Sequence, residues 1–372
     1  MQNMMFTNEE LNRYARHFAI PDFGQEGQAK LKAGRVLVIG AGGLGCPMLQ
    51  YLAAAGVGKI GIVDFDRIDL SNLQRQILYG TDDIGQLKAE VAKRKLLALN
   101  PHIDIQTYTV ALSRDNVLKL FSDYDIIADG TDNFPTRYLV NDACVLSGKV
   151  NVYASIFRFE GQVSVFNLPA ADGKRGHNYR DLYPAPPPPD MIPNCAEGGV
   201  LGVLPGIIGS MQAVEVIKVL TGVGDPLSGR LLLFDAAAFT ARVMKFPQDP
   251  SNQIRELVDY EIFCGTTMDG ATPIPSVTAA QLADMLKDGH SFQLIDVREQ
   301  SECDQEHLNG LLIPLGTLTS KLDLVAKDRP IVVHCQSGKR SIQACRTLME
   351  NGFHEVYNLT GGVNAWKRWK GK

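Results

Sequence analysis

The chain has 372 residues, of which 45% are hydrophobic and 21% charged, and its formal net charge at pH 7 is −4. These values are typical of a globular protein, and the length predicts two or three domains. The nearly balanced charge argues against nucleic-acid binding.

Neither the amino terminus nor the apolar stretches predict a membrane protein. The polar, charged stretch Met1–Arg16 lacks the apolar core of a secretory signal. The longest apolar stretch, Val200–Ile208, is interrupted by glycine and proline and falls far short of the ~20 residues that span a bilayer. We therefore expect a cytoplasmic protein without membrane contact, and we expect Val200–Ile208 to be buried core.

The first part of the chain alternates strand and helix patterns. A capping box at Thr7 and Glu10 predicts a short amphipathic helix. Residues 162–167 alternate apolar and polar side chains as an antiparallel strand does. The whole pattern predicts an α/β fold with a mixed, mostly parallel sheet and helices on both faces. Its other predicted elements are strands at 35–39, 59–64, 125–129 and 241–246 and helices at about 47–55 and 86–100.

A glycine motif lies between the first strand and its helix. Gly40, Gly42 and Gly45 have G-x-G-x-x-G spacing, with Gly43 inside it, so backbone amides can approach a phosphate at a helix amino end. Asp64 ends the next strand, where an acid can bind a ribose hydroxyl. Alone, this Rossmann-like pattern predicts a dinucleotide-dependent oxidoreductase.

Residues beyond the glycine motif favour a nucleoside triphosphate with magnesium. Basic side chains neutralise charge on phosphoryl oxygens and aspartate can hold Mg²⁺, whereas hydride transfer needs neither. Each residue alone could be a solvated surface group or a helix cap. Their joint occurrence argues against that interpretation; they are Asn72, Arg75, Lys88, Asp132 and Asn133.

These segments, with Asp64–Asp66, resemble the MoeB/ThiF family of adenylyltransferases, relatives of ubiquitin-activating enzymes. The resemblance covers about residues 5–250, so we assign residues 1–250 to an ATP-binding domain. It implies that the substrate is the C-terminal Gly-Gly end of a ubiquitin-like sulfur-carrier protein. It also implies that ATP is held by the glycine loop and by the groups at Asp64, Asn72, Arg75, Lys88 and Asn133.

The family resemblance implies two further roles. Asp132 matches the acid that serves the magnesium ion. Arg16 matches an arginine that reaches the triphosphate of the neighbouring subunit, so the resemblance implies a homodimer.

Cys195 follows a proline-rich stretch, Tyr183–Pro193, which predicts an exposed loop. The segment after it, Ala196–Gly202, is similar to the family's crossover loop with its reactive cysteine. An exposed loop near a nucleotide suits a thiol acceptor, and the other interpretation is a buried free thiol. Whether Cys195 forms a thioester, a disulfide or neither stays open.

Many members of the family hold a structural zinc with two Cys-x-x-Cys pairs. Here Asn178–Asp181 matches the first pair without either cysteine, and Glu261–Cys264 keeps one of the second. Such a mixed set makes a poor zinc site. We therefore expect no structural zinc and a region held by packing alone.

A second, smaller α/β unit, residues 276–372, follows a polar segment, 251–275, that we interpret as the linker. Ser276 is the predicted cap of its first helix. Its other predicted elements are strands at 292–297 and 331–334 and a helix from Ser341 to about Asn351.

Cys335 ends a predicted strand and begins the loop Cys335–Arg340, with a helix behind it. A helix amino end stabilises a thiolate and lowers its pKa. The loop, with Asp296–Arg298 and Gly361–Trp366, resembles a rhodanese active site, which implies that Cys335 carries a persulfide. A phosphatase loop is the alternative, but four residues separate Cys335 from Arg340, one fewer than in related phosphatases, and the ring is too small for phosphate.

Five of the seven cysteines receive no catalytic role, and Cys264 is one of them. Seven is an odd number spread over a long chain, which disfavours a disulfide framework and suits a reducing compartment. Cysteines in apolar or helical stretches usually behave as small hydrophobic side chains. We interpret Cys46, Cys144 and Cys345 as structural and Cys303 as incidental.

Together these features predict a two-step enzyme. ATP adenylates a carrier, with the small subunit of molybdopterin synthase favoured, and the Cys335 persulfide then supplies sulfur for a thiocarboxylate, with Cys195 a candidate for the reductive cleavage. A donor such as a cysteine desulfurase or thiosulfate would load Cys335. Two alternatives stay open: the same chemistry on a carrier for thiamine or cysteine synthesis, and an inactive nucleotide fold that serves as a scaffold for a rhodanese.

Overall fold

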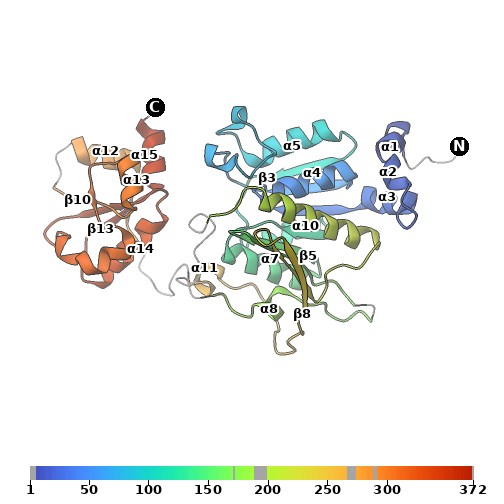
Figure 1. Ribbon diagram of the computed structural model, residues 1–372. Helices are drawn as coiled ribbons and strands as arrows, with labels where there is room; N and C mark the ends of the chain where they lie inside the picture. The colour runs from blue at the N-terminus through green and yellow to red at the C-terminus, as the bar shows by residue number, and fades with distance from the viewer. Residues whose placement is uncertain (1–5, 171, 188–198, 266–273, 288–290, 371–372) are drawn as a thin grey trace. The chain divides into compact units, whose positions relative to one another are not determined.

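The computed structural model describes residues 6–170, 172–187, 199–265, 274–287 and 291–370. The chain forms two compact units, Met1–Asp269 and Gly270–Lys372, each with its own sheet and core (Figure 1).

The first unit is built on an eight-stranded sheet of order β3-β2-β1-β4-β5-β6-β7-β8. The strands from β3 to β5 pair in parallel, and β5 to β8 pair antiparallel. The predicted mixed sheet, including the antiparallel strand near 162–167, is confirmed. The strands are β1 (Arg35–Ile39), β2 (Lys59–Val63), β3 (Asp104–Tyr108), β4 (Ile126–Asp129), β5 (Val150–Phe157), β6 (Glu160–Phe166), β7 (Arg230–Asp235) and β8 (Thr240–Lys245).

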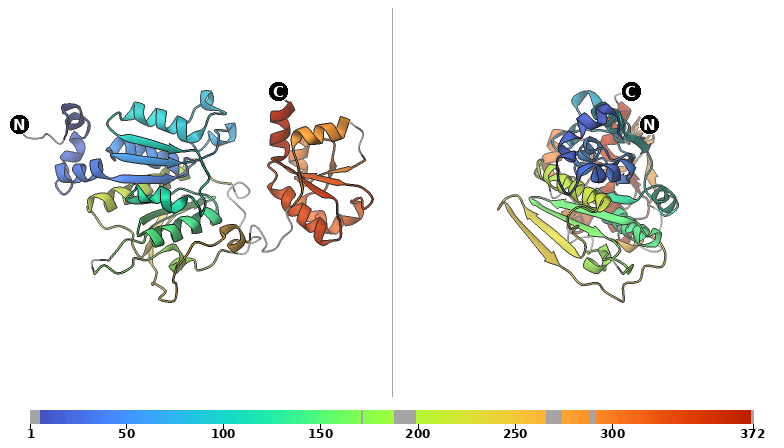
Figure 2. Two further views of the ribbon diagram at one scale, coloured as in Figure 1. Left: turned by 180° about the vertical axis from the view of Figure 1, so that it is seen from behind. Right: turned by 90° about the vertical axis from the view of Figure 1, so that its right-hand side faces the viewer.

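Helices cover both faces of this sheet, which is why β1 and β4 are buried nearly throughout (Figure 2). One core contains side chains of α3 (Gly24–Ala33), α4 (Gly45–Ala55), α5 (Lys88–Leu99) and α10 (Leu204–Thr221). The core on the other face contains side chains of α6 (Val117–Ser122), α7 (Phe134–Ser147), α8 (Tyr179–Leu182) and α11 (Tyr260–Phe263).

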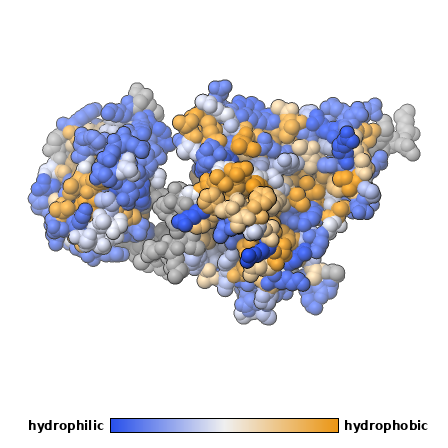
Figure 3. All heavy atoms as spheres, in the orientation of Figure 1, coloured by the Kyte–Doolittle hydropathy of each residue, from blue (hydrophilic) through white to orange (hydrophobic). Residues whose placement is uncertain are grey.

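Helix α10 is long and apolar enough to cross a membrane by length and composition, and half of it is buried against the rest of the unit. It packs on α4, β5 and β6. The expectation that Val200–Ile208 is buried core is only partly right. Leu204 and Ile208 are fully buried, whereas Val203 is 59% exposed, and Figure 3 shows apolar side chains at the surface of this unit.

The segment up to Gly265 belongs to the first unit, although residues 251–265 are part of the predicted linker. Tyr260 and Cys264 lie in its core, and the Tyr260 hydroxyl donates a 2.8 Å hydrogen bond to Asp142 Oδ2. Because this stretch is polar overall, its composition did not indicate that Tyr260 and Cys264 are buried.

The second unit has a five-stranded parallel sheet of order β11-β10-β12-β13-β9. Its strands are β9 (Ser276–Val277), β10 (Gln293–Asp296), β11 (Leu311–Leu312), β12 (Ile331–His334) and β13 (Val356–Leu359), and its helices are α12 (Ala279–Lys287), α13 (Gln300–Gln305), η3 (Leu315–Leu324), α14 (Lys339–Glu350) and α15 (Gly362–Lys370).

The predicted cap at Ser276 is wrong. Ser276 pairs with Asn358 in the sheet, and Thr278 Oγ1 instead accepts a hydrogen bond from the Gln281 amide at the start of α12. Two hydroxyl residues close together made the helix start ambiguous in sequence.

A polar network, and not packing alone, holds the region where relatives were expected to bind zinc. Arg180 donates to both carboxylate oxygens of Asp142, at 2.8 and 2.7 Å, and its guanidinium lies 4.4 Å from the centre of the Phe263 ring. Burial raises the pKa of the Cys264 thiol to about 12. Within the described residues, no three His, Cys, Asp or Glu side chains gather as metal ligands.

We predict that Asp142→Ala destabilises the first unit by about 3–5 kcal/mol, because Arg180 then stays buried without a counter-charge. Urea unfolding followed by far-UV circular dichroism measures this effect. Tryptophan fluorescence reports on the second unit alone, since Trp366 and Trp369 both lie there, and serves as an internal reference.

The matched control is Asp172→Ala, which removes an exposed ion pair with Lys174 and should leave the unfolding midpoint unchanged. Equal behaviour of the two variants would show that the Asp142 network contributes nothing to stability.

Candidate active sites

The topology of the first sheet places a ligand site between β1 and β4. The chain proceeds outward from β1 to β2 and β3 and then returns to β4 on the other side of β1. The loops after β1 and β4 therefore diverge at a topological switch point, where ligands of open α/β sheets bind.

Glycine is required where these two loops meet. Gly40 has φ +88°, and a Cβ there would lie 3.1 Å from the Gly130 carbonyl oxygen. A Cβ on Gly45 would lie 2.0 Å from the Gly40 oxygen, a distance that no side chain tolerates. In contrast, a Cβ on Gly42 would meet nothing nearer than Gln76 Nε2 at 3.8 Å. Packing within the protein therefore does not require a glycine at position 42.

The end of β2 holds the glycine loop in place. Asp64 accepts 2.8 Å hydrogen bonds from the Ala41 amide and from the Asp66 amide. Burial raises the pKa of the Asp64 carboxyl. The Tyr79 hydroxyl donates a 2.8 Å hydrogen bond to the Ala41 carbonyl, so two side chains fix the backbone at the motif.

Basic and amide groups gather beside the glycine loop. Lys88 begins α5, and its nearly buried ammonium group lies 3.0 Å from Asp66 Oδ2. A Cβ on Gly43 would lie 3.6 Å from Arg75 Cδ, so Arg75 passes directly over the motif. Gln76 is buried, and its Oε1 has no hydrogen-bond donor among the described residues. Gln76 was not among the predicted site residues, although its place inside a polar motif was the available signal.

Asn72 and Asn133, two of the predicted nucleotide ligands, act as local caps. Asn72 Oδ1 accepts a hydrogen bond from the Asp69 amide. Asn133 Oδ1 accepts a 3.0 Å hydrogen bond from the Thr136 amide and caps α7. Their amide nitrogens are the groups that remain for a nucleotide.

Two acids follow β4. Asp132 is exposed in the loop after the strand. Asp129, at the strand end, is completely buried: its Oδ1 accepts hydrogen bonds from the Thr131 amide and hydroxyl, and its Oδ2 has no donor within the described residues. Burial raises the pKa of Asp129. An acid that ends an apolar strand was the sequence signal for Asp129, and the prediction named Asp132 alone.

Arg16 lies at the opposite end of α4 from the glycine loop. It is exposed on α2 (Ala15–Phe18), just after Tyr14, which packs on Gly56 at the end of α4 and accepts a hydrogen bond from Asn100 at the end of α5. An 11-residue helix is about 16 Å long. Arg16 is therefore remote from the glycine loop of the same chain.

Cys195 lies outside the described residues. The cysteines predicted to be structural are buried, and burial raises the pKa of the Cys46 and Cys345 thiols to about 12. Burial raises the pKa of Cys144 as well.

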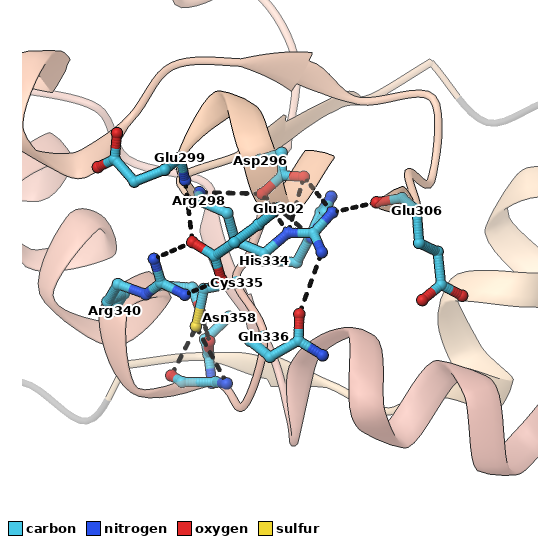
Figure 4. A network of polar contacts seen from close by, with 12 residues as sticks. Asp296, Arg298, Glu299, Glu302, Glu306, His334, Cys335, Gln336, Arg340 and Asn358 are labelled. Atoms are coloured by element: carbon cyan, nitrogen blue, oxygen red, sulfur yellow. Dashed lines mark hydrogen bonds and ion pairs between the residues drawn. The ribbon is translucent and has the colours of Figure 1, made fainter. Parts of the chain in front are cut away.

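The second unit presents Cys335 at the end of β12. The Gly338 amide donates a 3.2 Å hydrogen bond to Cys335 Sγ, and Ser341 Oγ lies 3.5 Å from the same sulfur (Figure 4). Gly338 has φ +93° at the start of α14. The loop therefore directs a backbone donor and a hydroxyl at one sulfur atom.

A buried ion pair supports the loop from behind. Arg298 is 1% exposed and pairs with Asp296 at 2.7 Å. Its guanidinium also donates a 3.1 Å hydrogen bond to Gln336 Oε1 in the Cys335 loop (Figure 4). The Asp296–Arg298 segment thus holds Gln336, the residue next to Cys335.

His334 precedes Cys335 and is completely buried. Neither ring nitrogen has a hydrogen-bond partner among the described residues. Burial lowers the pKa of this imidazole to about 4, against the opposing effect of the Asp296 carboxylate.

Comparison with known proteins decides the family. Residues 14–255 match the model of the ThiF family, and residues 278–368 match that of the rhodanese-like domain. The chain belongs to the ThiF family. Its second unit is a rhodanese-like domain.

Two similar proteins match this chain over nearly its whole length, and a third matches 70% of it. The chain is 50% identical, over 97% of its length and 94% of the relative's, to a protein of Mycobacterium tuberculosis named probable adenylyltransferase/sulfurtransferase MoeZ. It is 41% identical to adenylyltransferase and sulfurtransferase MOCS3 of Drosophila grimshawi, over 97% of this chain and 84% of that protein. A sulfur carrier protein adenylyltransferase of Thermus thermophilus is 51% identical over 70% of this chain and 99% of its own.

The same fold occurs in solved structures of E. coli MccB. One has a TM-score of 0.57 and 24% identity and covers 66% of this chain and 74% of its own. Another, titled with ATP, has a TM-score of 0.56, 23% identity, and coverage of 68% and 75%.

We predict that Gly42→Ala in the ThiF domain weakens ATP binding at least about tenfold without loss of stability. The added methyl finds free space in the protein but blocks the approach of a phosphate to the backbone amides. Isothermal titration with ATP measures the affinity, and Gly316→Ala in the rhodanese-like domain, also in open space, is the control. Unchanged ATP affinity in Gly42→Ala would show that this loop does not bind a phosphate of ATP.

We predict a pH dependence of the rhodanese-like domain from His334. Its folded-state pKa is lowered, so the unfolded state binds the proton more tightly and stability falls as pH drops from about 6.5 towards 4, by about 3 kcal/mol in all. His334→Gln should remove this slope, measured by urea unfolding with tryptophan fluorescence. His354→Gln, at an exposed position, should retain it; identical slopes in both variants would contradict the prediction.

Proposed function

We propose that the ThiF domain uses ATP to adenylate the C-terminal glycine of a ubiquitin-like sulfur-carrier protein, and that Cys335 then supplies sulfur to make a thiocarboxylate. The observation that carries this proposal is the presence of two sites in one chain: a glycine loop at a topological switch point and a thiol held by a Gly338 amide. Relatives similar over nearly the whole chain are named for both activities.

In the adenylation step the carrier's carboxylate attacks the α-phosphorus of ATP and pyrophosphate leaves. The amides at the amino end of α4 attract the phosphates, and Asp64 lies where it can accept a ribose hydroxyl. Arg75 and Lys88 would neutralise phosphoryl charge. Because Lys88 pairs with Asp66, the phosphates must compete with that carboxylate for the ammonium group.

Magnesium fits the acids after β4. Asp132 would hold the ion, and the free Oδ2 of Asp129 lies in the same segment. Mg²⁺ uses one or two carboxylates together with substrate phosphates, so a complete protein cage is not needed. The ion would withdraw charge from the phosphoryl oxygens.

A homodimer accounts for Arg16, which lies at the opposite end of α4 from its own glycine loop. Exposed apolar side chains at Val214, Val243 and Met244 offer surface for a subunit contact. We propose that Arg16 completes the triphosphate site of the neighbouring subunit.

In the sulfur step the Cys335 persulfide attacks the acyl carbon of the carrier adenylate, and AMP leaves with the bonding electron pair. The product is a carrier acyl disulfide on Cys335. Reductive cleavage of this S–S bond then releases the thiocarboxylate: a thiol reductant supplies two electrons and restores the Cys335 thiolate. Cys195 is the candidate for the attacking thiol.

We favour the small subunit of molybdopterin synthase as the carrier, with carriers for thiamine or cysteine synthesis as alternatives. The adenylyltransferase names of the relatives argue against an inactive scaffold. The free state of every described cysteine suits a reducing compartment and supports a cytoplasmic location.

The decisive measurement is ATP–pyrophosphate exchange with each small Gly-Gly-tailed protein of the same genome. We expect exchange with one carrier, which would name the pathway. Thiosulfate sulfurtransferase activity at Cys335 without exchange on any carrier would make the ThiF domain a scaffold.

We predict that Cys335→Ala abolishes thiocarboxylate formation, measured by mass spectrometry of the carrier, and leaves ATP–pyrophosphate exchange within about twofold of the parent. The thiol lies in the second unit and has no part in phosphoryl transfer. Cys345→Ala, at a buried position on α14, controls for a change in packing. Loss of exchange in Cys335→Ala alone would contradict the division of labour.

A further inference from the structure

Arg340, the last residue of the Cys335 loop, is bound by a carboxylate of the same unit. Its two terminal nitrogens donate hydrogen bonds to both oxygens of Glu302 on α13, at 2.7 and 2.6 Å (Figure 4). Arg340 follows Gly338 by two residues, a span of at most about 7 Å along the chain, and the Gly338 amide contacts Cys335 Sγ. The pair therefore borders the nucleophile.

Glu302 is itself fixed in position. Its Oε2 accepts a 3.1 Å hydrogen bond from the Glu299 amide and so closes the capping box of α13. The Arg340 guanidinium lowers the pKa of the Glu302 carboxyl, so the side chain stays ionised near neutral pH. Both members of the pair are only about a quarter to a third exposed. The planar guanidinium of Arg340 thus makes two hydrogen bonds to one oriented carboxylate, which satisfies both of its terminal nitrogens.

Two further cations of this unit are also held by carboxylates. Arg298 pairs with Asp296, and Lys367 pairs with Glu306 just beyond α13. A guanidinium that can turn to Cys335 would stabilise an oxyanion donor there, and the Glu302 carboxylate competes with such a donor for Arg340. Thiosulfate carries two negative charges, and sulfite leaves when its outer sulfur is transferred.

We propose that Glu302 determines the class of sulfur donor: by holding Arg340 it disfavours oxyanion donors such as thiosulfate and favours organic persulfides. This inference rests on the proposed transfer of sulfur at Cys335. The Cys335 thiolate attacks the outer sulfur of a donor R–S–SH, the donor's S–S bond breaks, and the thiolate R–S⁻ leaves with the electron pair. Neither the attack nor the departure needs the Arg340 guanidinium.

The test is Glu302→Gln in the full-length protein. Glutamine has the same shape and can still accept the Glu299 amide, but it removes the charge that holds Arg340. We expect kcat/KM for thiosulfate to rise about tenfold at low ionic strength, with the gain reduced by added salt. Transfer from cysteine persulfide should change by less than about twofold.

Two variants control for other causes. Asp304→Asn removes a charge from the same helix, where Asp304 accepts a hydrogen bond from Gln300 and does not contact Arg340; it should leave thiosulfate transfer nearly unchanged. The double variant Glu302→Gln with Arg340→Gln should lose the whole gain, because no guanidinium remains to bind the oxyanion. This double variant also replaces the ion pair by two amides, so it distinguishes an effect of charge from an effect on folding.

The outcomes are distinct. A thiosulfate gain in Glu302→Gln that depends on Arg340 supports the proposal. An unchanged thiosulfate rate, an equal gain with both donors, or the same gain in Asp304→Asn overturns it while leaving sulfur transfer intact. If neither donor gives a rate above that of Cys335→Ala, the sulfur-transfer function itself fails, and this proposal fails with it.

Discussion

Close backbone packing within the loop after β1, and between the loops after β1 and β4, is the constraint on which the nucleotide site depends. With a Cβ at Gly45 only 2.0 Å from the Gly40 oxygen, any larger residue would push α4 away from the sheet. The contact directs the amino end of α4 at the switch point and leaves the neighbouring loops for Lys88, Arg75 and Asp132. Asp64 and Tyr79 then stabilise the loop through its Ala41 backbone.

The ion pairs of the two domains are of two kinds: one stabilises the fold, and the others lie at the candidate sites. Asp142 with Arg180 is a buried pair, and both partners are needed to avoid an isolated charge. Lys88 with Asp66 and Arg340 with Glu302 instead lie beside the glycine loop and the Cys335 loop, where the proposed ligands carry negative charge. In those pairs the carboxylate would compete with the ligand for the cation, and the geometry of the ion pair would then affect substrate choice.

The sequence predicted the local motifs of both candidate sites better than the contacts that surround them. The G-x-G-x-x-G spacing and the Cys335–Arg340 loop are local patterns, and the α/β architecture follows from strand and helix periodicity. The missed residues lie in other segments: Gln76 and Asp129 differ from ordinary polar residues only in burial, and Glu302 meets Arg340 across 38 positions. The prediction of packing alone near Cys264 failed for the same reason, since Asp142 and Arg180 are also 38 positions apart.

By itself, the sequence determined the order of elements, the glycine loop after β1, the loop that begins at Cys335 and the absence of two Cys-x-x-Cys pairs. These depend on residue type and spacing within short segments, where the backbone geometry is set locally. The tertiary structure alone decided which acids are buried, which cations are paired and which end of the sheet Arg16 occupies. Burial and pairing arise from contacts between segments distant in the chain, and no local pattern encodes the electrostatic environment that those contacts create.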